Sequence, residues 1–187
     1  MRRDEAEVRE NIIKAAMKVF SVHGFFRAPV NLIAKEAGIS KGLIFWYFRS
    51  KDELILEVAS RSLPKDVIDG CLDEKLDGRK LLECIGRKYM DKYRDPVLKN
   101  LLIHTMSSET VYQEIRSKIG EICNMYTREL AKKVFGGDTP KYLVAIRTFL
   151  GSLMCYTLRT PKDIEEDEYL SHLIGIVYDL VEKNRAT

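Results

Sequence analysis

A short stretch near the N-terminus brings together basic, aromatic and small residues in a pattern suited to binding nucleic acid. Its ammonium groups and its indole and phenol donors can bind phosphate oxygens, whereas its apolar side chains can contact thymine methyl groups. A glycine among them lets the backbone approach a ligand closely. The residues that we expect to contact DNA in this stretch are Lys41, Gly42, Leu43, Phe45, Trp46, Tyr47 and Lys51.

The elements that position this stretch are predicted to be two helices joined by a tight turn. An apolar stripe with helical spacing covers about residues 29–38, and Pro29 fits its first turn because the N–H that proline lacks would be unpaired there. Gly38 can take positive φ after that helix, and Ser40 is a good N-cap for the next helix, at about residues 41–48. Such a pair forms a helix-turn-helix, whose second helix enters the major groove of DNA.

The residues around this turn also resemble a known signature. Gly24-Phe25 is followed, from Ile33 to Leu54, by IAKEAGISKGLIFWYFRSKDEL. In order, spacing and residue type, this segment resembles the N-terminal signature of TetR-type transcriptional regulators, over about residues 9–54. The resemblance implies an all-α homodimer that represses transcription until a small molecule binds its body.

The resemblance further implies roles for single residues. By position, base contacts would come from Lys41, Gly42, Leu43 and Phe45, and phosphate contacts from Trp46, Tyr47 and Lys51. Two positions depart from the family pattern. Ala28-Pro29 stands where the family usually has two threonines, so a cap and a phosphate contact are missing there, and we expect Arg27 to compensate. Trp46 stands where the family often has a histidine, which is a smaller side chain.

The aromatic run around Trp46 has a competing interpretation as hydrophobic core. At helical spacing Ile44 and Phe48 share one face, which we expect to be buried. Phe45, Trp46 and Tyr47 cannot all join that face, so part of the run should be exposed beside lysines. Exposed aromatic residues in this setting favour a binding surface over a core.

Net positive charge is concentrated in the same part of the chain. The formal net charge of the 187 residues is +3; residues 1–54 hold ten Lys/Arg and seven Asp/Glu, whereas residues 55–187 hold 21 of each. A basic head and a neutral body are expected when only the head meets a polyanion. We therefore predict a helix-turn-helix DNA-binding domain at residues 1–50 and a helical effector-binding and dimerisation domain at residues 51–187.

The whole chain is predicted to be helical. Apolar residues recur at three- and four-residue steps, and no alternating strand pattern or internal repeat is present. Glycines, prolines and capping residues, among them a Ser50–Glu53 capping box, divide the chain into about nine helices, which predicts an all-α fold. The predicted helices cover about residues 8–23, 29–38, 41–48, 51–63, 79–93, 96–106, 111–135, 140–159 and 166–183.

An enzyme is the main alternative class of protein, and the sequence lacks the usual features of one. The three histidines have no paired acid or nucleophile at recognisable spacing, and His23 is expected in the core or at a cap of the first helix. No nucleophile-elbow, zinc-protease or P-loop motif is present. We predict a non-enzymatic protein with no metal site and no cofactor. A helical partner-binding protein is the third interpretation, and the helix-turn-helix signature argues against it.

The last two predicted helices are the expected interface of a homodimer. The final helix carries a broad apolar stripe, and small residues on both helices allow close approach between them. The alternative is one thick monomeric core. The interface residues that we predict are Gly151, Leu170, Leu173, Ile174, Val177, Leu180 and Val181.

A mostly apolar cavity in the body is predicted to hold a lipophilic effector, such as a drug-like molecule or an acyl chain. The side chains that would line it recur at helical steps along residues 111–135 and are faced by residues of neighbouring helices. The alternative for each of them is ordinary core. The lining residues that we predict are Leu102, Met106, Tyr112, Ile115, Ile119, Ile122, Cys123, Tyr126, Phe149, Leu153 and Tyr156.

The four cysteines are expected to be small apolar side chains of a reduced, cytoplasmic protein. None forms a Cys-x-x-Cys pair or lies near a histidine at ligand spacing, which argues against a disulfide framework and a zinc site. The charged N-terminus argues against a secretory signal. The apolar stretch from Tyr142 to Leu158 is too short and too polar to span a membrane and fits a helix buried in protein.

Overall fold

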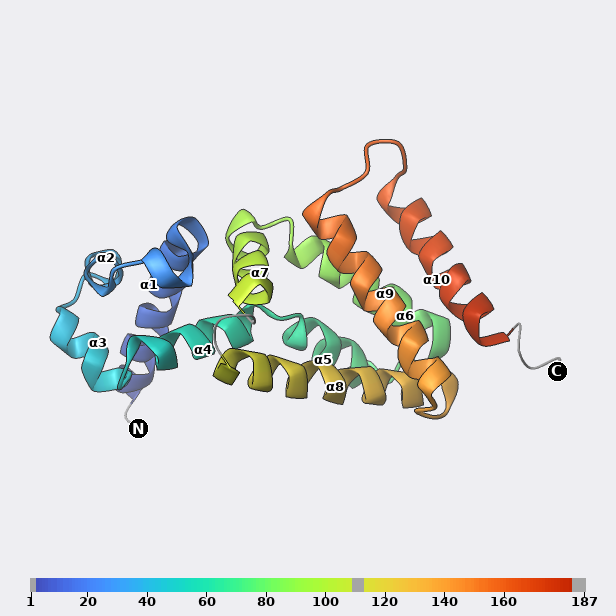
Figure 1. Cartoon of the computed structure of the whole chain (residues 1–187), viewed down its shortest axis with the longest axis horizontal. Helices are drawn as coiled ribbons and strands as arrows, with labels where there is room; N and C mark the ends of the chain where they lie inside the picture. Colours follow the sequence, from blue (N-terminus) through green and yellow to red (C-terminus); the bar gives the residue numbers. More distant parts are fainter. Residues whose placement is uncertain (1–2, 109–112, 183–187) are drawn as a thin grey trace. The chain divides into compact units, whose positions relative to one another are not determined.

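The computed structural model of the chain describes residues 3–108 and 113–182, and all regular structure in these two ranges is α-helix (Figure 1). The all-α fold predicted from the sequence is therefore confirmed. The helices of the described residues are α1 (Arg3–Arg27), α2 (Val30–Ala37), α3 (Lys41–Tyr47), α4 (Lys51–Ser62), α5 (Lys65–Asp73), α6 (Gly78–Lys92), α7 (Pro96–Ser108), α8 (Gln113–Phe135), α9 (Pro140–Leu158) and α10 (Glu166–Glu182).

Contacts between the helices group the chain into two compact units. The first unit takes its described residues from 1–63 and 95–119, and the second takes its described residues from 64–94 and 120–187. The first unit thus contains α4 and α7 in addition to the three helices around the predicted turn. The functional division at residue 50 stays a prediction, because packing alone does not assign DNA binding or effector binding to either part.

The core of the first unit forms where α1 packs against α2, α4 and α7. Phe20 and Phe25 of α1 are fully buried, and their rings meet edge to face with centroids 5.3 Å apart. The hydroxyl groups of Ser62 and Thr105 share a buried hydrogen bond of 2.8 Å, which joins α4 to α7. Apolar burial and this satisfied polar pair therefore both hold the first unit together.

Gly24 interrupts α1 but does not end it. Its backbone has φ 72° and ψ 165°, a conformation that only glycine adopts readily, and a last helical turn follows to Arg27. The sequence predicts that the first helix stops at Gly24, and the chain instead bends there. An added Cβ at Gly24 would lie 3.5 Å from the imidazole of His104 on α7, an ordinary contact distance, so it is the backbone conformation that calls for glycine here.

In the second unit α6 packs against α5, α9 and α10, and α9 packs against α10. The closest approach of backbone to side chain is at Gly86, where an added Cβ would lie 2.3 Å from Cδ1 of Leu170. Leu170 is 2% exposed, so it fills the space that the missing side chain leaves on α6. Small residues therefore set the spacing between α6 and α10.

The sequence missed one helix, α5. Pro64 predicts the end of the preceding helix, because proline cannot donate the hydrogen bond that would continue it. The same property makes proline acceptable at the start of the next helix, and the Pro64 carbonyl accepts from the Ile68 N–H at 3.0 Å. Pro64 thus ends α4 and also begins α5, which gives ten helices in the described residues instead of about nine.

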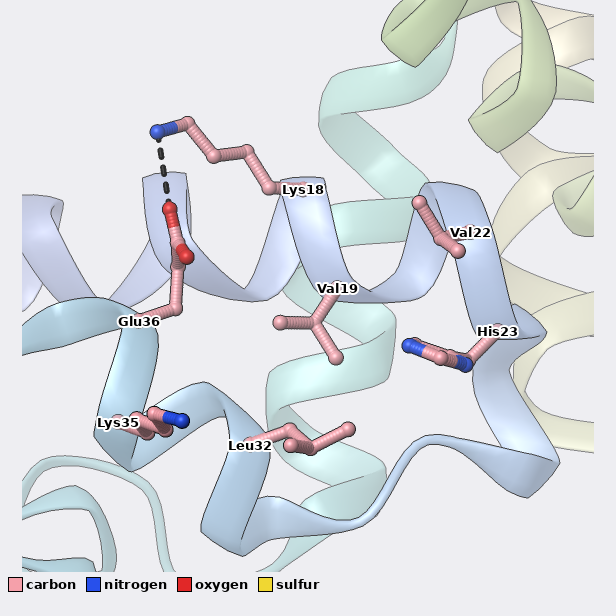
Figure 2. Close-up of a pocket in the computed structure, with 7 residues that line it drawn as sticks. All are labelled: Lys18, Val19, Val22, His23, Leu32, Lys35 and Glu36. Atoms are coloured by element: carbon pink, nitrogen blue, oxygen red, sulfur yellow. Dashed lines mark hydrogen bonds and ion pairs between the residues drawn. The ribbon is translucent and has the colours of Figure 1, made fainter.

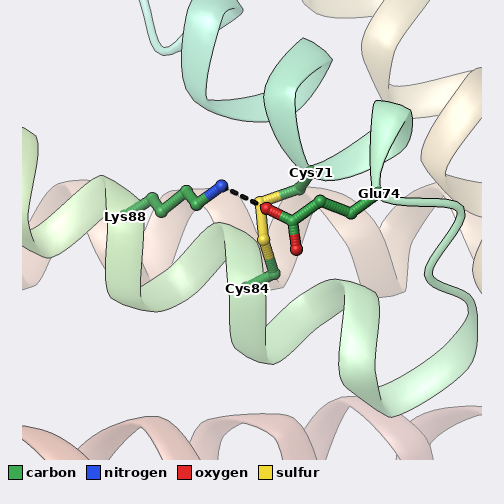
Figure 3. Close-up of a disulfide and its surroundings, with 4 residues drawn as sticks. All are labelled: Cys71, Glu74, Cys84 and Lys88. Carbon is green, nitrogen blue, oxygen red and sulfur yellow. Dashed lines mark hydrogen bonds and ion pairs between the residues drawn. A yellow bond between two sulfur atoms is a disulfide. The ribbon is translucent and has the colours of Figure 1, made fainter.

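The expectation that all cysteines are reduced is wrong for one pair. Cys71 on α5 and Cys84 on α6 form a disulfide, beside an ion pair between Lys88 and Glu74 (Figure 3). The two residues are 13 positions apart and their Cα atoms lie 6.0 Å apart. No short motif marks such a pair, since the spacing follows from the turn between two helices. Cys123 and Cys155 are free and exposed.

Helix α9 contains the apolar stretch that the sequence compares with a membrane span. In the described part of the chain, no helix is both long and apolar enough to cross a membrane. Part of the apolar surface of α9 packs inside the second unit, where Ile146, Phe149 and Leu153 are fully buried.

Candidate nucleic-acid interface

The turn between α2 and α3 is closed by backbone hydrogen bonds that need glycine. Gly38 has φ 67° and ψ 29°, the left-handed conformation that ends α2, and its N–H donates to the Lys35 carbonyl at 3.2 Å. The N–H of Ile39 donates to the Ala34 carbonyl at 3.0 Å. The side-chain amide of Asn11 on α1 donates to the Ala37 carbonyl at 2.9 Å. These bonds fix the angle at which α3 leaves α2.

Two residues anchor α3 while both ends of the helix are capped. Ser40 Oγ accepts from the Leu43 N–H at 3.3 Å, and the N–H of Phe48 donates to the Ile44 carbonyl at 2.9 Å. Ile44 and Phe48 are 2% and 0% exposed. The guanidinium of Arg9 lies 4.9 Å from the centroid of the Phe48 ring, which ties the end of α3 to α1.

The remaining side chains of α3 are presented outward. Trp46 is 68% exposed, and Phe45 and Leu43 are 40% and 36% exposed. The rings of Trp46 and Tyr47 meet edge to face at 4.7 Å, and the Lys41 ammonium lies 5.9 Å from the Phe45 ring centroid. The predictions that Ile44 and Phe48 are buried and that part of the aromatic run is exposed are therefore confirmed. Gly42 is exposed between them.

The start of α4 carries a capping box in which the glutamate bonds to the residue before the N-cap instead of to the N-cap itself. Ser50 Oγ accepts from the Glu53 N–H at 3.1 Å, as the sequence predicts. The Glu53 carboxylate accepts from the N–H of Arg49 at 2.7 Å, one residue before the cap. This reciprocal pair fixes the direction of the chain between α3 and α4.

Lys51 is held by a partner that the sequence did not indicate. Its ammonium donates to the backbone carbonyl of Phe26 at 2.9 Å, so it joins the start of α4 to the end of α1. Partial burial lowers the pKa of Lys51, against the carboxylate of Asp52, which raises it. A backbone carbonyl has no sequence signal, which is why this contact was missed.

The segment between α1 and α2 lacks the cap that threonines would supply. Pro29 is the N-cap of α2 and makes no side-chain hydrogen bond to the helix. Arg27 lies in the last turn of α1 and is exposed. Arg27 is therefore free to reach a phosphate near the start of α2, as predicted, while that contact itself stays a prediction.

Four charged side chains, two on each helix, clamp α1 to α4. Glu57 accepts from Arg9 at 3.1 Å and from Arg61 at 2.9 Å, and Arg61 also donates to both oxygens of Glu10 at 2.7 Å. Burial raises the pKa of Glu57, but the hydrogen bonds and charges of the two arginines outweigh burial and hold that pKa below its usual value. The clamp fixes α4, the helix that follows α3, against α1.

The residues predicted to line an effector cavity fall in both units. Leu102, Met106 and Ile119 belong to the first unit, and Ile122, Cys123, Tyr126, Phe149, Leu153 and Tyr156 belong to the second. Of the second group, four are buried and Cys123 is exposed. Tyr112 and the side chain of Ile115 lie outside what the structure describes. A common cavity stays a prediction.

The predicted dimer residues divide between the core and the surface of the protomer. Leu170, Leu173, Ile174, Val177 and Val181 are 0–6% exposed within a single chain. Only Leu180, at 45% exposure, and Gly151 are presented outward. The apolar stripe of α10 therefore packs within the protomer, which periodicity alone cannot distinguish from an interface. His23, expected in the core or at a cap, is likewise exposed.

Comparison with known proteins agrees with this geometry. Residues 12–58 match the profile of the bacterial regulatory proteins of the tetR family. AcrR, an HTH-type transcriptional regulator from Shigella flexneri, is 32% identical over 124 residues, which cover 65% of this chain and 50% of AcrR. The chain thus spans about half the length of this curated relative.

Solved structures extend the likeness to the whole fold. A TetR family regulator from Marinobacter aquaeolei VT8 superposes with a TM-score of 0.73 at 19% identity, covering 96% of this chain and 98% of that one. FadR from Bacillus subtilis, crystallised with stearoyl-CoA, gives 0.66 at 19% identity, covering 92% and 97%. The relatives are transcriptional regulators and not enzymes, as the sequence predicts. Residues 12–58 therefore match the tetR family of bacterial regulatory proteins, and the rest of the chain shares the fold of TetR family regulators.

Proposed function

We propose that the chain is a dimeric, sequence-specific DNA-binding regulator that represses transcription until a lipophilic small molecule releases it from its operator. The observation that carries this proposal is the surface of α3. The helix is anchored by Ile44 and Phe48 and leaves the aromatic side chains of Phe45 and Trp46 exposed, with Lys41 exposed at its start. A globular protein seldom exposes such a run unless it binds something.

In this proposal α3 lies in the major groove of the operator. Lys41, Gly42, Leu43 and Phe45 reach base edges, and Trp46 and Tyr47 donate to phosphates. Lys51 already donates one hydrogen to the Phe26 carbonyl, so a phosphate would share the ammonium with that carbonyl. Arg27, exposed at the end of α1, supplies a further phosphate contact.

A dimer would present two copies of α3 to two half-sites. We propose that its interface is the exposed apolar face of α9 and α10, which pack side by side in the second unit (Figure 1). Ile176 and Leu180 lie one turn apart on α10, at 56% and 45% exposure. On α9, Val144 is 58% exposed and Gly151 is exposed without a side chain to hold a partner away.

An effector would bind among the helices of the body. Tyr126, Phe149, Leu153 and Tyr156 give the second unit a buried aromatic and aliphatic interior, which suits a lipophilic molecule. FadR, which shares this fold, binds stearoyl-CoA, so an acyl chain is one class that we propose beside drug-like compounds. The ligand would act by binding better to the conformation that does not fit the operator. We place this regulator in the cytoplasm, where bacterial DNA lies.

The direct test is selection of operators from a random duplex library by the full chain, followed by titration of the enriched duplex. We expect an inverted repeat to be enriched and its affinity to fall linearly with the logarithm of salt concentration, with a slope that counts released counterions. A long-chain acyl-CoA or a lipophilic drug added to that complex should release the DNA. Binding that is weak and equal for every duplex would contradict the proposal.

A further inference from the structure

The outer side of the helix-turn-helix holds a groove that the proposed DNA contacts do not use. It lies between α1 and α2 and encloses about 470 Å³. Figure 2 shows Val19 and His23 of α1 and Leu32 of α2 pointing into the space between the two helices. All of these residues belong to the first unit. The volume is in the range of small-molecule sites, roughly 300–1,000 Å³.

Three apolar side chains line the groove between its polar residues, and they are incompletely covered. Val19 forms a buried floor, whereas Leu32 is 37% exposed and Val22, on the rim, is 75% exposed. Water against these side chains would be released by any ligand with a hydrocarbon body. The groove therefore favours an apolar occupant over a purely polar one.

The charges around the groove select among apolar occupants. Glu36 is neutralised by Lys18, whose ammonium lies 2.9 Å from its carboxylate and closes one end of the groove (Figure 2). Lys35 also lines the groove, is exposed, and makes no ion pair within the described part of the chain. The His23 imidazole likewise has no hydrogen-bond partner among the described residues. Lys35 thus supplies the one charge of the groove that no ion pair within the described residues neutralises, and this charge is positive.

We propose that this groove binds a small organic monocarboxylate with an apolar body, such as a medium-chain alkyl or aryl acid. The carboxylate accepts a hydrogen bond from Lys35 at one end of the groove, and the hydrocarbon lies along Val19, Val22 and Leu32 toward His23 at the other end. A dianion is disfavoured because Glu36 stays within the same groove. This site is on the DNA-binding head, apart from the effector site proposed for the body, and does not rest on that proposal.

Octanoate is the probe that tests the site on the full-length protein. Its binding is followed by the methyl resonances of valine and leucine, with 1-octanol and octyltrimethylammonium as neutral and cationic probes of the same length. We expect octanoate to shift the methyl groups of Val19, Val22 and Leu32 saturably. Because a partly exposed charge pair is weak, Lys35→Ala should lower that affinity by about three- to fivefold.

A matched variant and a conservative one separate charge from folding. Lys14 is exposed on α1 and does not line the groove, so Lys14→Ala should bind octanoate as the wild type does. Lys35→Arg should keep most of the affinity because it keeps the positive charge. Unshifted groove methyl groups, shifts confined to the second unit, equal shifts with octanol or the cation, or an unchanged affinity in Lys35→Ala would each overturn the proposal. DNA selection is a separate experiment, so its failure would leave this result standing.

Discussion

At the scale of single residues, the DNA-binding account depends on side chains of α3 that are exposed and so contribute little to the packing of the core. Trp46 is the only tryptophan of the chain and is 68% exposed, with its ring against Tyr47. A large apolar side chain in water gains little stability from its position, so its role must lie in what it contacts. Lys51 differs, because its bond to the Phe26 carbonyl also joins α4 to α1.

Trp46→Ala should therefore weaken operator binding by roughly tenfold, as expected when one hydrogen bond to a charged phosphate and its apolar contact are lost, ~1.5 kcal/mol. Thermal stability and dimerisation should not change. Met125 on α8 offers the control, because it is 50% exposed and lies outside the proposed DNA surface. Fluorescence anisotropy of a labelled operator measures the affinity of both variants. Equal losses of operator affinity in Trp46→Ala and Met125→Ala would show that Trp46 does not belong to the interface.

Glu57 makes the stability of the first unit depend on pH. Its pKa in the folded chain is below its usual value, so its contribution is complete above that usual value and is lost as pH falls through the folded-state pKa. The free energy of unfolding of the wild type should therefore fall more than that of Glu57→Gln as the pH is lowered from 4.5 through the folded-state pKa. Glu7→Gln, an exposed site on α1, is the control and should follow the wild type. Parallel pH curves for wild type and Glu57→Gln would contradict the role of the clamp.

At the scale of elements, the sequence predicted what local chemistry determines. Gly38, Ser40 and the Ser50–Glu53 box were correctly placed because turns and caps depend on residues close in the chain. It missed α5 because Pro64 is compatible with both an end and a start of a helix. It missed the pairing of Cys71 with Cys84, and the packing of Leu170 inside the protomer, because both depend on which helices become neighbours.

The disulfide should stabilise the pairing of α5 with α6. Cross-linking residues 13 positions apart removes conformational entropy from the unfolded chain worth about 3 kcal/mol in the chain-entropy account. The double variant Cys71→Ser/Cys84→Ser should unfold at lower denaturant concentration by that amount, and reduction of the wild type should match it. Cys123→Ser/Cys155→Ser removes two exposed free thiols and is the control. Equal stability of both double variants would show that the bond does not form in solution.

Packing of α6 against α10 should be equally sensitive to size. Gly86→Ala places a methyl group 2.3 Å from Cδ1 of the buried Leu170 and should destabilise the chain by about 1–3 kcal/mol. Gly120→Ala meets nothing within 4 Å on α8 and should stabilise it by about 0.5–1 kcal/mol through helix propensity. Chemical denaturation measures both. A Gly86→Ala variant as stable as the wild type would mean that α10 is not held against α6.

At the scale of the whole molecule, the account requires two copies of the chain. The face of α9 and α10 that remains apolar and exposed after the protomer has folded is the surface available for that contact. Recognition of an inverted repeat then follows from the symmetry of the dimer. Neither the partner of this face nor the effector could be predicted residue by residue, because an apolar helical stripe has the same pattern in a core, a cavity and an interface.

Ile176→Asp should dissociate the dimer, since it places a charge at the centre of a contact that excludes water. Sedimentation should show a folded monomer at concentrations where the wild type is a dimer, with operator affinity reduced at least tenfold. Met125→Asp introduces the same charge at 50% exposure on α8 and should leave the dimer intact. A dimeric Ile176→Asp variant would move the interface elsewhere.

The central claim, that α3 lies against DNA, has a direct readout in the single tryptophan. Acrylamide quenching of Trp46 fluorescence is measured in the free protein, with a saturating selected operator, and with an unrelated duplex. The account predicts strong quenching in the free protein, because the indole is 68% exposed, and a large loss of quenching only with the operator. An operator complex in which Trp46 is quenched as readily as in the free protein would contradict it.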